Sequence, residues 1–184
     1  MTRQAGIIIK ILNRNMGIDA VKTGAEVGVW SGDTSACLLR HLPNLTLHMV
    51  DCWEPKVSLR ATRHKTEKSL IAAEKKAMEQ TEFASDRRFV HKMTSEEAAI
   101  LIADGSLDFA FIDACHLYDD VRQDIALWYP KIKVGGLVAG HDYVASEGSW
   151  VGRTWGVKKA VDEFAAVHDY KPIVWRTVWW VIKK

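Results

Sequence analysis

The sequence predicts an α/β fold: a doubly wound, mostly parallel sheet with helices on both faces. Three observations predict it. Strand-like and helix-like segments alternate along the 184 residues, as they do in βαβ units. The segment from Leu107 to Asp113 is nearly all apolar, which is typical of a strand covered on both faces. Near the end, two apolar segments are joined by a tight connection at Arg176-Thr177. A connection of about two residues cannot make a parallel crossover, so the last strand must run antiparallel to the one before it.

The first half of the chain begins with a helix over 5–16, where apolar residues fall at helical spacing and Gly17 stands at the C-cap position. Strands are expected at 25–29 and 45–51. Between them, cap-type residues at 31–34 open a helix that runs to about His41. After an irregular, basic segment at 54–65, the spacing predicts a helix over 66–82 and a strand over 88–93.

In the second half, Ser95-Glu96-Glu97 opens a short helix after Thr94. A strand at 107–113 and a helix at 118–132 follow. Gly135-Gly136 is expected to turn the chain into a strand at 137–140. A Gly/Ser loop at 145–152 leads to a helix over 154–167, and the final strands are expected at 173–175 and 178–182.

Composition places the chain among ordinary soluble domains, with 48% hydrophobic and 26% charged residues. We expect one domain over residues 1–184, with residues 1–20 as an N-terminal helical extension. The net charge of +2 does not favour nucleic-acid binding, and no apolar run approaches the roughly 20 residues of a membrane span. Three widely spaced cysteines without a CxxC pair favour a reducing compartment. The expected location is therefore the cytoplasm.

The turn after the first strand reads Glu26-Val27-Gly28-Val29-Trp30-Ser31-Gly32. A glycine-bearing turn between a strand and a helix lets a ligand approach the backbone closely. The dinucleotide fingerprint G-x-G-x-x-G fails here, because Trp30 and Asp33 stand where its second and third glycines belong. Trp30 would crowd a pyrophosphate and Asp33 would repel it. A phosphate-free adenosine with a positively charged amino-acid end fits better, and Glu26 could reach its ammonium directly or through water.

Asp51 ends the second predicted strand, about 20 residues beyond this turn. An acidic side chain at that place accepts hydrogen bonds from both ribose hydroxyls. The alternative is that Asp51 is a solvated residue at a strand end.

These segments together resemble class I S-adenosylmethionine-dependent methyltransferases, and more narrowly the small sugar and macrolide O-methyltransferases. The resemblance covers about residues 20–184. Besides the first turn and Asp51, it rests on Phe111-Ile112-Asp113-Ala114-Cys115-His116-x-Tyr118, Gly135-Gly136-Leu137-Val138-Ala139-Gly140-His141-Asp142-Tyr143 and Val178-Trp179-Trp180. It implies a seven-stranded sheet of order 3-2-1-4-5-7-6 with strand 7 antiparallel, in agreement with the terminal hairpin.

The resemblance also implies S-adenosylmethionine as the cofactor. Its contacts would be Glu26, Gly28 and Asp51, with Thr94 and Ser95 on the adenine side and Asp113 beside the methionine end. Trp30 departs from the broad family's second glycine, although the narrower group often has a bulky residue there. We include Trp30 and Gly32 of the turn among the expected contacts, and also Trp53, whose ring could flank the adenine.

A second constellation consists of Asp113, His116, His141 and Asp142, which follow two strands expected to be neighbours. In the metal-dependent sugar and catechol O-methyltransferases, three oxygen ligands at matching positions hold Mg²⁺. Here Asp113, His141 and Asp142 would hold Mg²⁺ or Mn²⁺, and the imidazole shifts the preference toward softer metals or toward none. Without a metal, a hydroxyl acceptor needs a base. The candidates are His141, Asp142 and His116, in that order.

Our hypothesis from the sequence is a methyltransferase that methylates a hydroxyl of a sugar or another small molecule. Two alternatives stay open. One is a non-catalytic adenosine-binding subunit, and the other is an NAD-dependent oxidoreductase, against which the glycine spacing and the terminal hairpin argue. The expected partner is the small-molecule hydroxyl acceptor, with neither nucleic acid nor membrane, and a homodimer is left open.

Overall fold

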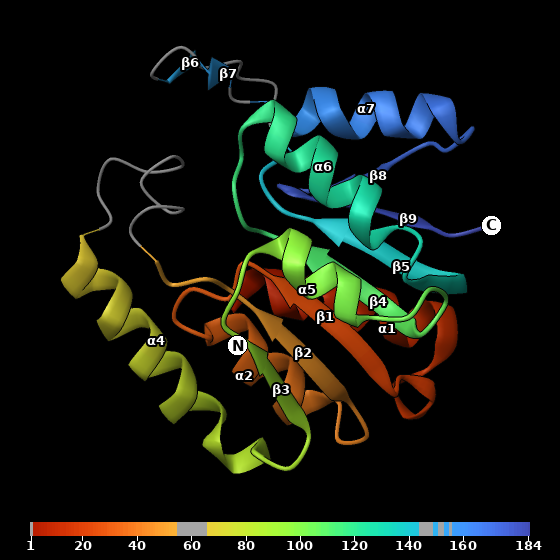
Figure 1. Ribbon diagram of the computed structural model, residues 1–184. Coiled ribbons are helices and arrows are strands. Elements are labelled where there is room, and N and C mark those ends of the chain that lie inside the picture. The colour runs from red at the N-terminus through yellow and green to blue at the C-terminus, as the bar shows by residue number, and fades with distance from the viewer. Residues whose placement is uncertain (1, 55–65, 144–148, 151–152, 155) are drawn as a thin grey trace.

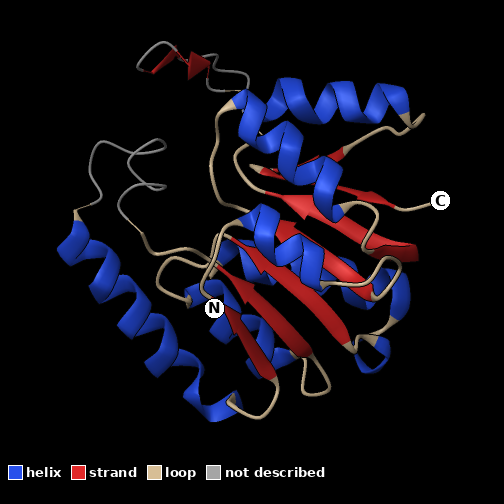
Figure 2. Ribbon diagram, in the orientation of Figure 1, coloured by secondary structure: helices blue, strands red, loops and turns tan. Residues whose placement is uncertain are grey.

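A seven-stranded sheet runs through the centre of the molecule, with helices on both of its faces (Figures 1 and 2). This computed structural model describes residues 2–54, 66–143, 149–150, 153–154 and 156–184. The strand order is β3-β2-β1-β4-β5-β9-β8. Neighbours from β3 to β5 pair in parallel, whereas β9 is antiparallel to both β5 and β8. The predicted fold class, strand order and antiparallel last strand are confirmed.

The strands of this sheet start within two residues of the expected positions, except β5. They are β1 (Thr23–Val27), β2 (Thr46–Val50), β3 (Arg88–His91), β4 (Leu107–Ile112), β5 (Ile132–Gly140), β8 (Ile173–Trp175) and β9 (Val178–Ile182). Every residue of β4 is buried, as its apolar sequence predicts. A separate hairpin is formed by β6 (Ser149–Trp150) and β7 (Arg153–Thr154).

The helices divide between the two faces and form one apolar core on each. On one face lie α1 (Arg3–Met16), α2 (Asp33–His41) and α4 (Glu67–Thr81). On the other lie α5 (Ser95–Leu101), α6 (Tyr118–Trp128) and α7 (Val157–Val167). Short 3₁₀ turns occur at η1 (Ile18–Ala20) and η2 (Glu82–Ala84). Among the described residues, no helix combines the length and apolar character needed to cross a bilayer.

The N-terminal helix is part of the core. Ile8 and Leu12 on α1 are completely buried, and they belong to the same cluster as Phe109 and Phe111 of the central strand β4. Within the segment that we expected as a helical extension, α1 therefore contributes one of the layers that cover the sheet (Figure 1).

Three expected boundaries are wrong by three residues or more. The helix predicted over 118–132 ends at Trp128, and the strand predicted at 137–140 already begins at Ile132. Gly135 and Gly136 therefore lie inside β5. The pairing with β4 shifts register around them. The Gly136 carbonyl accepts the Lys183 N–H, and the Gly135 N–H donates to the Lys183 carbonyl. The glycines thus mark an irregular stretch of a strand. The helix expected from 154 begins at Val157, and the basic segment 55–65 lies outside the described residues.

Candidate functional site

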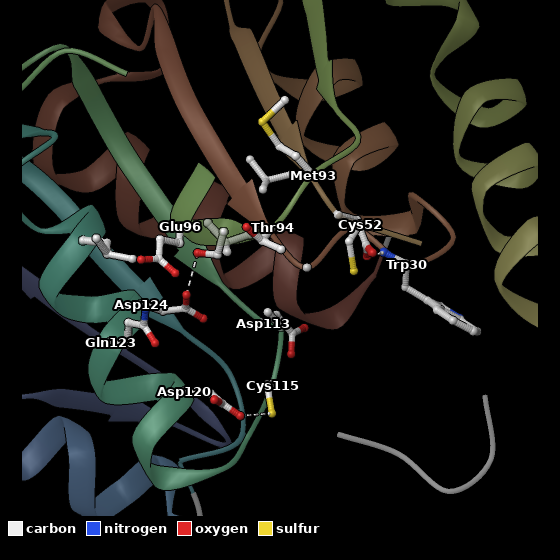
Figure 3. Close-up of a pocket in the computed structure, with 17 residues that line it drawn as sticks. Trp30, Cys52, Met93, Thr94, Glu96, Asp113, Cys115, Asp120, Gln123 and Asp124 are labelled. Carbon is white, nitrogen blue, oxygen red and sulfur yellow. Dashed lines mark hydrogen bonds between the residues drawn. The ribbon is translucent and has the colours of Figure 1, made fainter. Parts of the chain in front are cut away.

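A pocket of about 290 Å³ opens at the carboxyl ends of β1, β2 and β4 (Figure 3). The first turn of α5 and one side of α6 form its far wall. Its lining carries five carboxyl groups, those of Asp51, Glu96, Asp113, Asp120 and Asp124. Among the described residues, no lysine or arginine lines it. The pocket is therefore suited to a ligand with positive charge and unsuited to phosphate groups.

Six of the nine residues expected to contact a cofactor line this pocket: Gly28, Trp30, Asp51, Thr94, Ser95 and Asp113. They come from four loops that the parallel topology brings together at one edge of the sheet. Glu26, Gly32 and Trp53 do not line it.

The ends of β1 and β4 approach closely at Gly28. The Gly28 backbone has a φ of 94°, and its N–H donates to the Val50 carbonyl at 2.8 Å. A Cβ at this position would lie 2.3 Å from the carbonyl oxygen of Asp113. Glycine is thus required by the neighbouring backbone as well as by any ligand in the pocket.

The Asp51 carboxylate is held by the backbone of two loops. One oxygen accepts the Trp30 N–H at 2.8 Å, and the other accepts the Trp53 N–H at 3.0 Å. Trp30 adopts a φ of 51°, a left-handed conformation that is uncommon for a bulky residue. These bonds orient the carboxylate at the pocket wall, and each oxygen keeps a lone pair for a ligand.

Glu26 lies beneath the turn and does not open into the pocket. It is 2% exposed, and its carboxyl accepts a hydrogen bond from the Ser35 hydroxyl on α2. Burial raises the pKa of Glu26 to about 8, and the hydrogen bond from Ser35 only partly opposes this. The side chain points under α2, so the expected direct contact with a ligand ammonium is not made from this conformation.

Gly32 and Trp53 serve the packing beneath the pocket. Gly32 is the N-cap of α2 with a φ of 76°, and a Cβ there would lie 2.8 Å from the Cα of Ala77 on α4. The Trp53 side chain is 4% exposed within the core under α2, and its indole N–H donates to the Trp30 carbonyl at 2.8 Å. The expectation that the Trp53 ring flanks a ligand is therefore wrong for this conformation. Its indole supports the turn from below.

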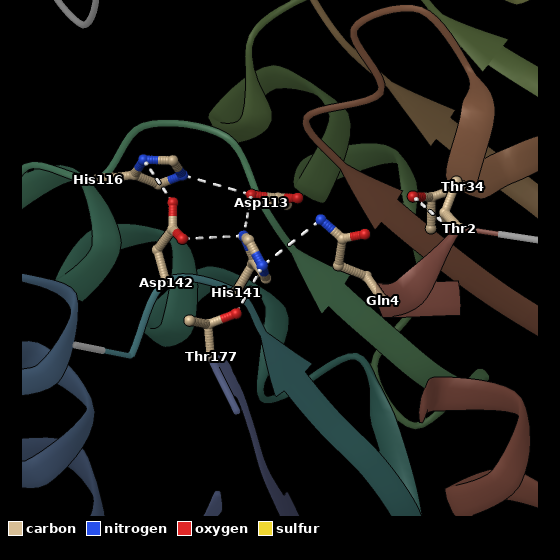
Figure 4. A network of polar contacts seen from close by, with 8 residues as sticks. All are labelled: Thr2, Gln4, Thr34, Asp113, His116, His141, Asp142 and Thr177. Atoms are coloured by element: carbon tan, nitrogen blue, oxygen red, sulfur yellow. Dashed lines mark hydrogen bonds and ion pairs between the residues drawn. The ribbon is translucent and has the colours of Figure 1, made fainter. Parts of the chain in front are cut away.

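The residues of the second constellation do converge, at the ends of β4 and β5 (Figure 4). His116 bridges the two carboxylates, with Nε2 3.3 Å from Asp113 and Nδ1 3.2 Å from Asp142. His141 Nδ1 lies 3.1 Å from Asp142 and 3.6 Å from Asp113. The ligand atoms of Asp113, His141 and Asp142 all lie within 4.8 Å of one another. Two oxygens and one imidazole nitrogen at these separations fit a divalent ion such as Mn²⁺.

The charges within this cluster compensate one another. Burial alone would lower the pKa of His141, but its hydrogen bonds to Asp113 and Asp142 outweigh that effect and raise the pKa to about 9. The hydrogen bond from His141 in turn lowers the pKa of Asp142. In the ligand-free protein, an imidazolium thus lies between two carboxylates.

Several residues at the site were missed from the sequence. Gln4 on α1 places its amide nitrogen 3.4 Å from His141 Nε2, and the Thr177 hydroxyl lies 2.9 Å from the same atom (Figure 4). Asp120 and Asp124 line the pocket from α6. Their spacing of four residues along a predicted helix was the available signal, because it puts both on one side. Gln4 and Thr177 had no such signal.

Residues 25–143 match a family described as a methyltransferase domain. Among curated proteins, no sequence matches the chain.

Three solved structures illustrate the shared fold. A protein from Staphylococcus aureus assigned as a caffeoyl-CoA O-methyltransferase has a TM-score of 0.70 at 16% identity, over 100% of this chain and 84% of that one. The Podospora anserina methyltransferase PaMTH1, with bound S-adenosylhomocysteine, gives 0.67 at 15%, over 100% and 80%. The Streptomyces achromogenes O-methyltransferase TomG of tomaymycin synthesis, in complex with S-adenosylmethionine, gives 0.65 at 13%, over 100% and 82%.

Proposed function

We propose a function for this chain from the premise that it belongs to the methyltransferase-domain family, which matches residues 25–143. It is an S-adenosylmethionine-dependent O-methyltransferase, and its acceptor is a hydroxyl group of a sugar or another small molecule. Three structures of the same fold are named as methyltransferases, two of them as O-methyltransferases. Their names support the choice of oxygen as the acceptor atom.

The charge of the pocket carries this proposal. Five carboxyl groups and, among the described residues, no lysine or arginine line the cavity. S-adenosylmethionine has a sulfonium and an ammonium but no phosphate, so this lining attracts it. A dinucleotide would bring its pyrophosphate against the same carboxyl groups, which disfavours the oxidoreductase alternative.

Each part of the pocket has a role in this proposal. The oriented Asp51 carboxylate accepts hydrogen bonds from the two ribose hydroxyls, and Asp113 lies beside the methionine end. Bound S-adenosylmethionine supplies a methyl group already activated by the sulfonium. The main task of the protein is then to align an acceptor oxygen with that methyl group.

The cluster of Asp113, His116, His141 and Asp142 adjoins the pocket through Asp113 and handles the acceptor proton. The acceptor oxygen bonds to the methyl carbon as the carbon–sulfur bond breaks, and the hydroxyl proton passes to the cluster. Asp113, His141 and Asp142 would hold a divalent metal, whose contribution would be to polarise the acceptor oxygen. In a metal-free mechanism, Asp142 or His116 takes the proton, because His141 already carries one on each ring nitrogen at neutral pH.

Calorimetry with S-adenosylhomocysteine tests the cofactor assignment. We expect binding to the intact protein and weakening by about 10- to 100-fold in Asp51→Ala, because a hydrogen bond to a charged group is worth about 1.5–3 kcal/mol. Asp51→Asn keeps an acceptor for the Trp30 N–H. Its affinity should lie between those of the intact protein and Asp51→Ala. Absence of binding, unchanged binding in Asp51→Ala, or preferred binding of NAD would each contradict the proposal.

The metal is tested in a methyl-transfer assay with a panel of hydroxyl acceptors. We expect a chelator to reduce the rate and Mn²⁺ to restore it better than Mg²⁺, because an imidazole is in the donor set. His141→Asp creates a set of three carboxylates and should shift the preference toward Mg²⁺. A methyl-transfer rate that is unchanged by the chelator would favour the metal-free mechanism. Cofactor binding without transfer to any acceptor would favour the non-catalytic subunit.

A further inference from the structure

A buried carboxyl group faces the pocket from α6 and is not used by the proposed mechanism. Asp124 is 6% exposed, although it lines the cavity. One of its oxygens accepts the Ser95 hydroxyl at 2.5 Å. Within the described part of the chain, its other oxygen has no hydrogen-bond partner, and Figure 3 shows the carboxyl group turned toward the cavity. This oxygen is open to the cavity, where a bound ligand could pair with it.

The direction of the Ser95 hydroxyl is set by a third residue. The indole N–H of Trp128 donates to Ser95 Oγ at 2.8 Å. Because this bond occupies the hydroxyl oxygen as an acceptor, the Ser95 proton is left for Asp124. The chain Trp128–Ser95–Asp124 therefore orients the carboxyl group and leaves its outer edge toward the cavity.

The protonation of Asp124 suits a neutral ligand edge. Burial raises its pKa to about 7, the Ser95 hydrogen bond opposes this, and the nearby charge of Asp120 adds to it. A protonated carboxyl group presents one donor and one acceptor side by side. The lining of the same cavity also includes the apolar side chains of Val50, Met93 and Leu127. Apolar surface together with a polar group that can donate and accept suits a flat heteroaromatic ring.

We propose that Asp124, oriented by Ser95, recognises the amino-pyrimidine edge of the adenine, which makes it a specificity-determining residue for the cofactor. Its outer oxygen donates to the ring nitrogen N1, and its inner oxygen accepts from the exocyclic amino group together with Ser95. This inference rests on the proposed function, because it assumes that an adenosine occupies the pocket with its ribose at Asp51.

The test compares two ligands by calorimetry: S-adenosylhomocysteine and its purine riboside analogue, which lacks only the 6-amino group. We expect the wild-type protein to bind the analogue about tenfold more weakly, the effect of one net hydrogen bond. Asp124→Leu removes both hydrogen-bonding groups, so the two ligands should bind it with nearly equal affinity. Asp124→Asn keeps a donor and an acceptor and should retain the tenfold ratio, and Ser95→Ala should reduce it to about threefold.

Asp119→Leu is the matched control, because Asp119 is exposed on the same helix and its replacement should leave the ratio unchanged. A ratio that stays near tenfold in Asp124→Leu would overturn the inference and leave the proposed function standing. If that variant does not fold, loss of the ratio in Asp124→Asn, or a full ratio in Ser95→Ala, would overturn it instead. Failure of the wild-type protein to bind S-adenosylhomocysteine would contradict the proposed function itself.

Discussion

At the scale of single residues, the acidic side chains around the pocket differ in how deeply they are buried. Asp51 lies at the wall and accepts two backbone N–H groups. Glu26 and Asp124 are buried, and burial raises their pKa values to about 8 and about 7. At neutral pH these two carboxyl groups therefore carry less negative charge than ordinary ones, which limits the repulsion among the acids of the site.

Glu26→Gln should make the stability of the protein less dependent on pH. Because the pKa of Glu26 is about 8 in the folded protein and 4.5 as its ordinary value, the unfolded chain loses this proton first as pH rises. The free energy of unfolding should therefore fall between about pH 4.5 and pH 8. Glu26→Gln removes this dependence, so the variant should melt at a higher temperature than wild type at pH 8, by about 2–4 °C for each kcal/mol.

Thermal melts at pH 5, 6.5 and 8 check this. The melting temperatures of wild type and Glu26→Gln should differ least at pH 5, and the difference should increase toward pH 8. A residual decline is expected in the variant because Asp124 also has a raised pKa. Equal melting temperatures at pH 8 would show that the Glu26 carboxyl is not protonated in the folded protein.

The sequence predicts residue identity at the pocket better than side-chain direction. Asp51 follows from its place at a strand end, because the topology puts such residues at one edge of the sheet. Glu26 is one of the same set by position, yet its side chain turns under α2 toward Ser35. Trp53 likewise turns into the core. Such directions depend on the helix that packs over each residue, which local spacing does not specify.

At the scale of elements, the contact between α2 and α4 depends on a glycine. Gly32→Ala should lower the free energy of unfolding by about 1–2 kcal/mol for its left-handed backbone, and by about 1–3 kcal/mol more for overpacking against Ala77. Gly105→Ala is the control, because Gly105 has a φ of 63° but nothing within 4 Å of the added Cβ. Urea unfolding should show a clearly larger loss for Gly32→Ala, and equal losses would mean that the helices can move apart.

The type of each element was predictable from periodicity, whereas the end of α6 and the start of β5 were not. The cap residues of α5 locate its start, since Thr94 and Glu97 form a capping box. The end of α6 at Trp128 and the early start of β5 at Ile132 escaped prediction because a glycine pair usually marks a turn. Here the pair lies in a strand whose pairing with β4 is irregular, and that pairing is a property of the neighbouring strand.

At the scale of the whole molecule, α1 contributes to stability as a covering layer. Ile8→Ala should lower the free energy of unfolding by about 2–5 kcal/mol, because Ile8 is completely buried against the sheet. Lys10→Ala on the exposed side of the same helix should cost no more than about 0.5–1 kcal/mol. Chemical denaturation measures both. Similar small losses would mean that the packing of α1 against the sheet contributes little to stability.

The global topology followed from the sequence because alternation and the short last connection leave few arrangements open. The role of α1 did not follow. Its apolar pattern predicts a helix with one buried face, but the pattern does not say which surface that face meets.

Residues far apart in the sequence meet at His141, because its partners include Gln4 on α1 and Thr177 just before β9. During synthesis on the ribosome, the N-terminal helix is made long before the final hairpin. The nascent polypeptide therefore cannot complete this hydrogen-bonded arrangement until β9 has left the exit tunnel and inserted beside β5. Assembly of this cluster is thus tied to the insertion of β9 and cannot precede it.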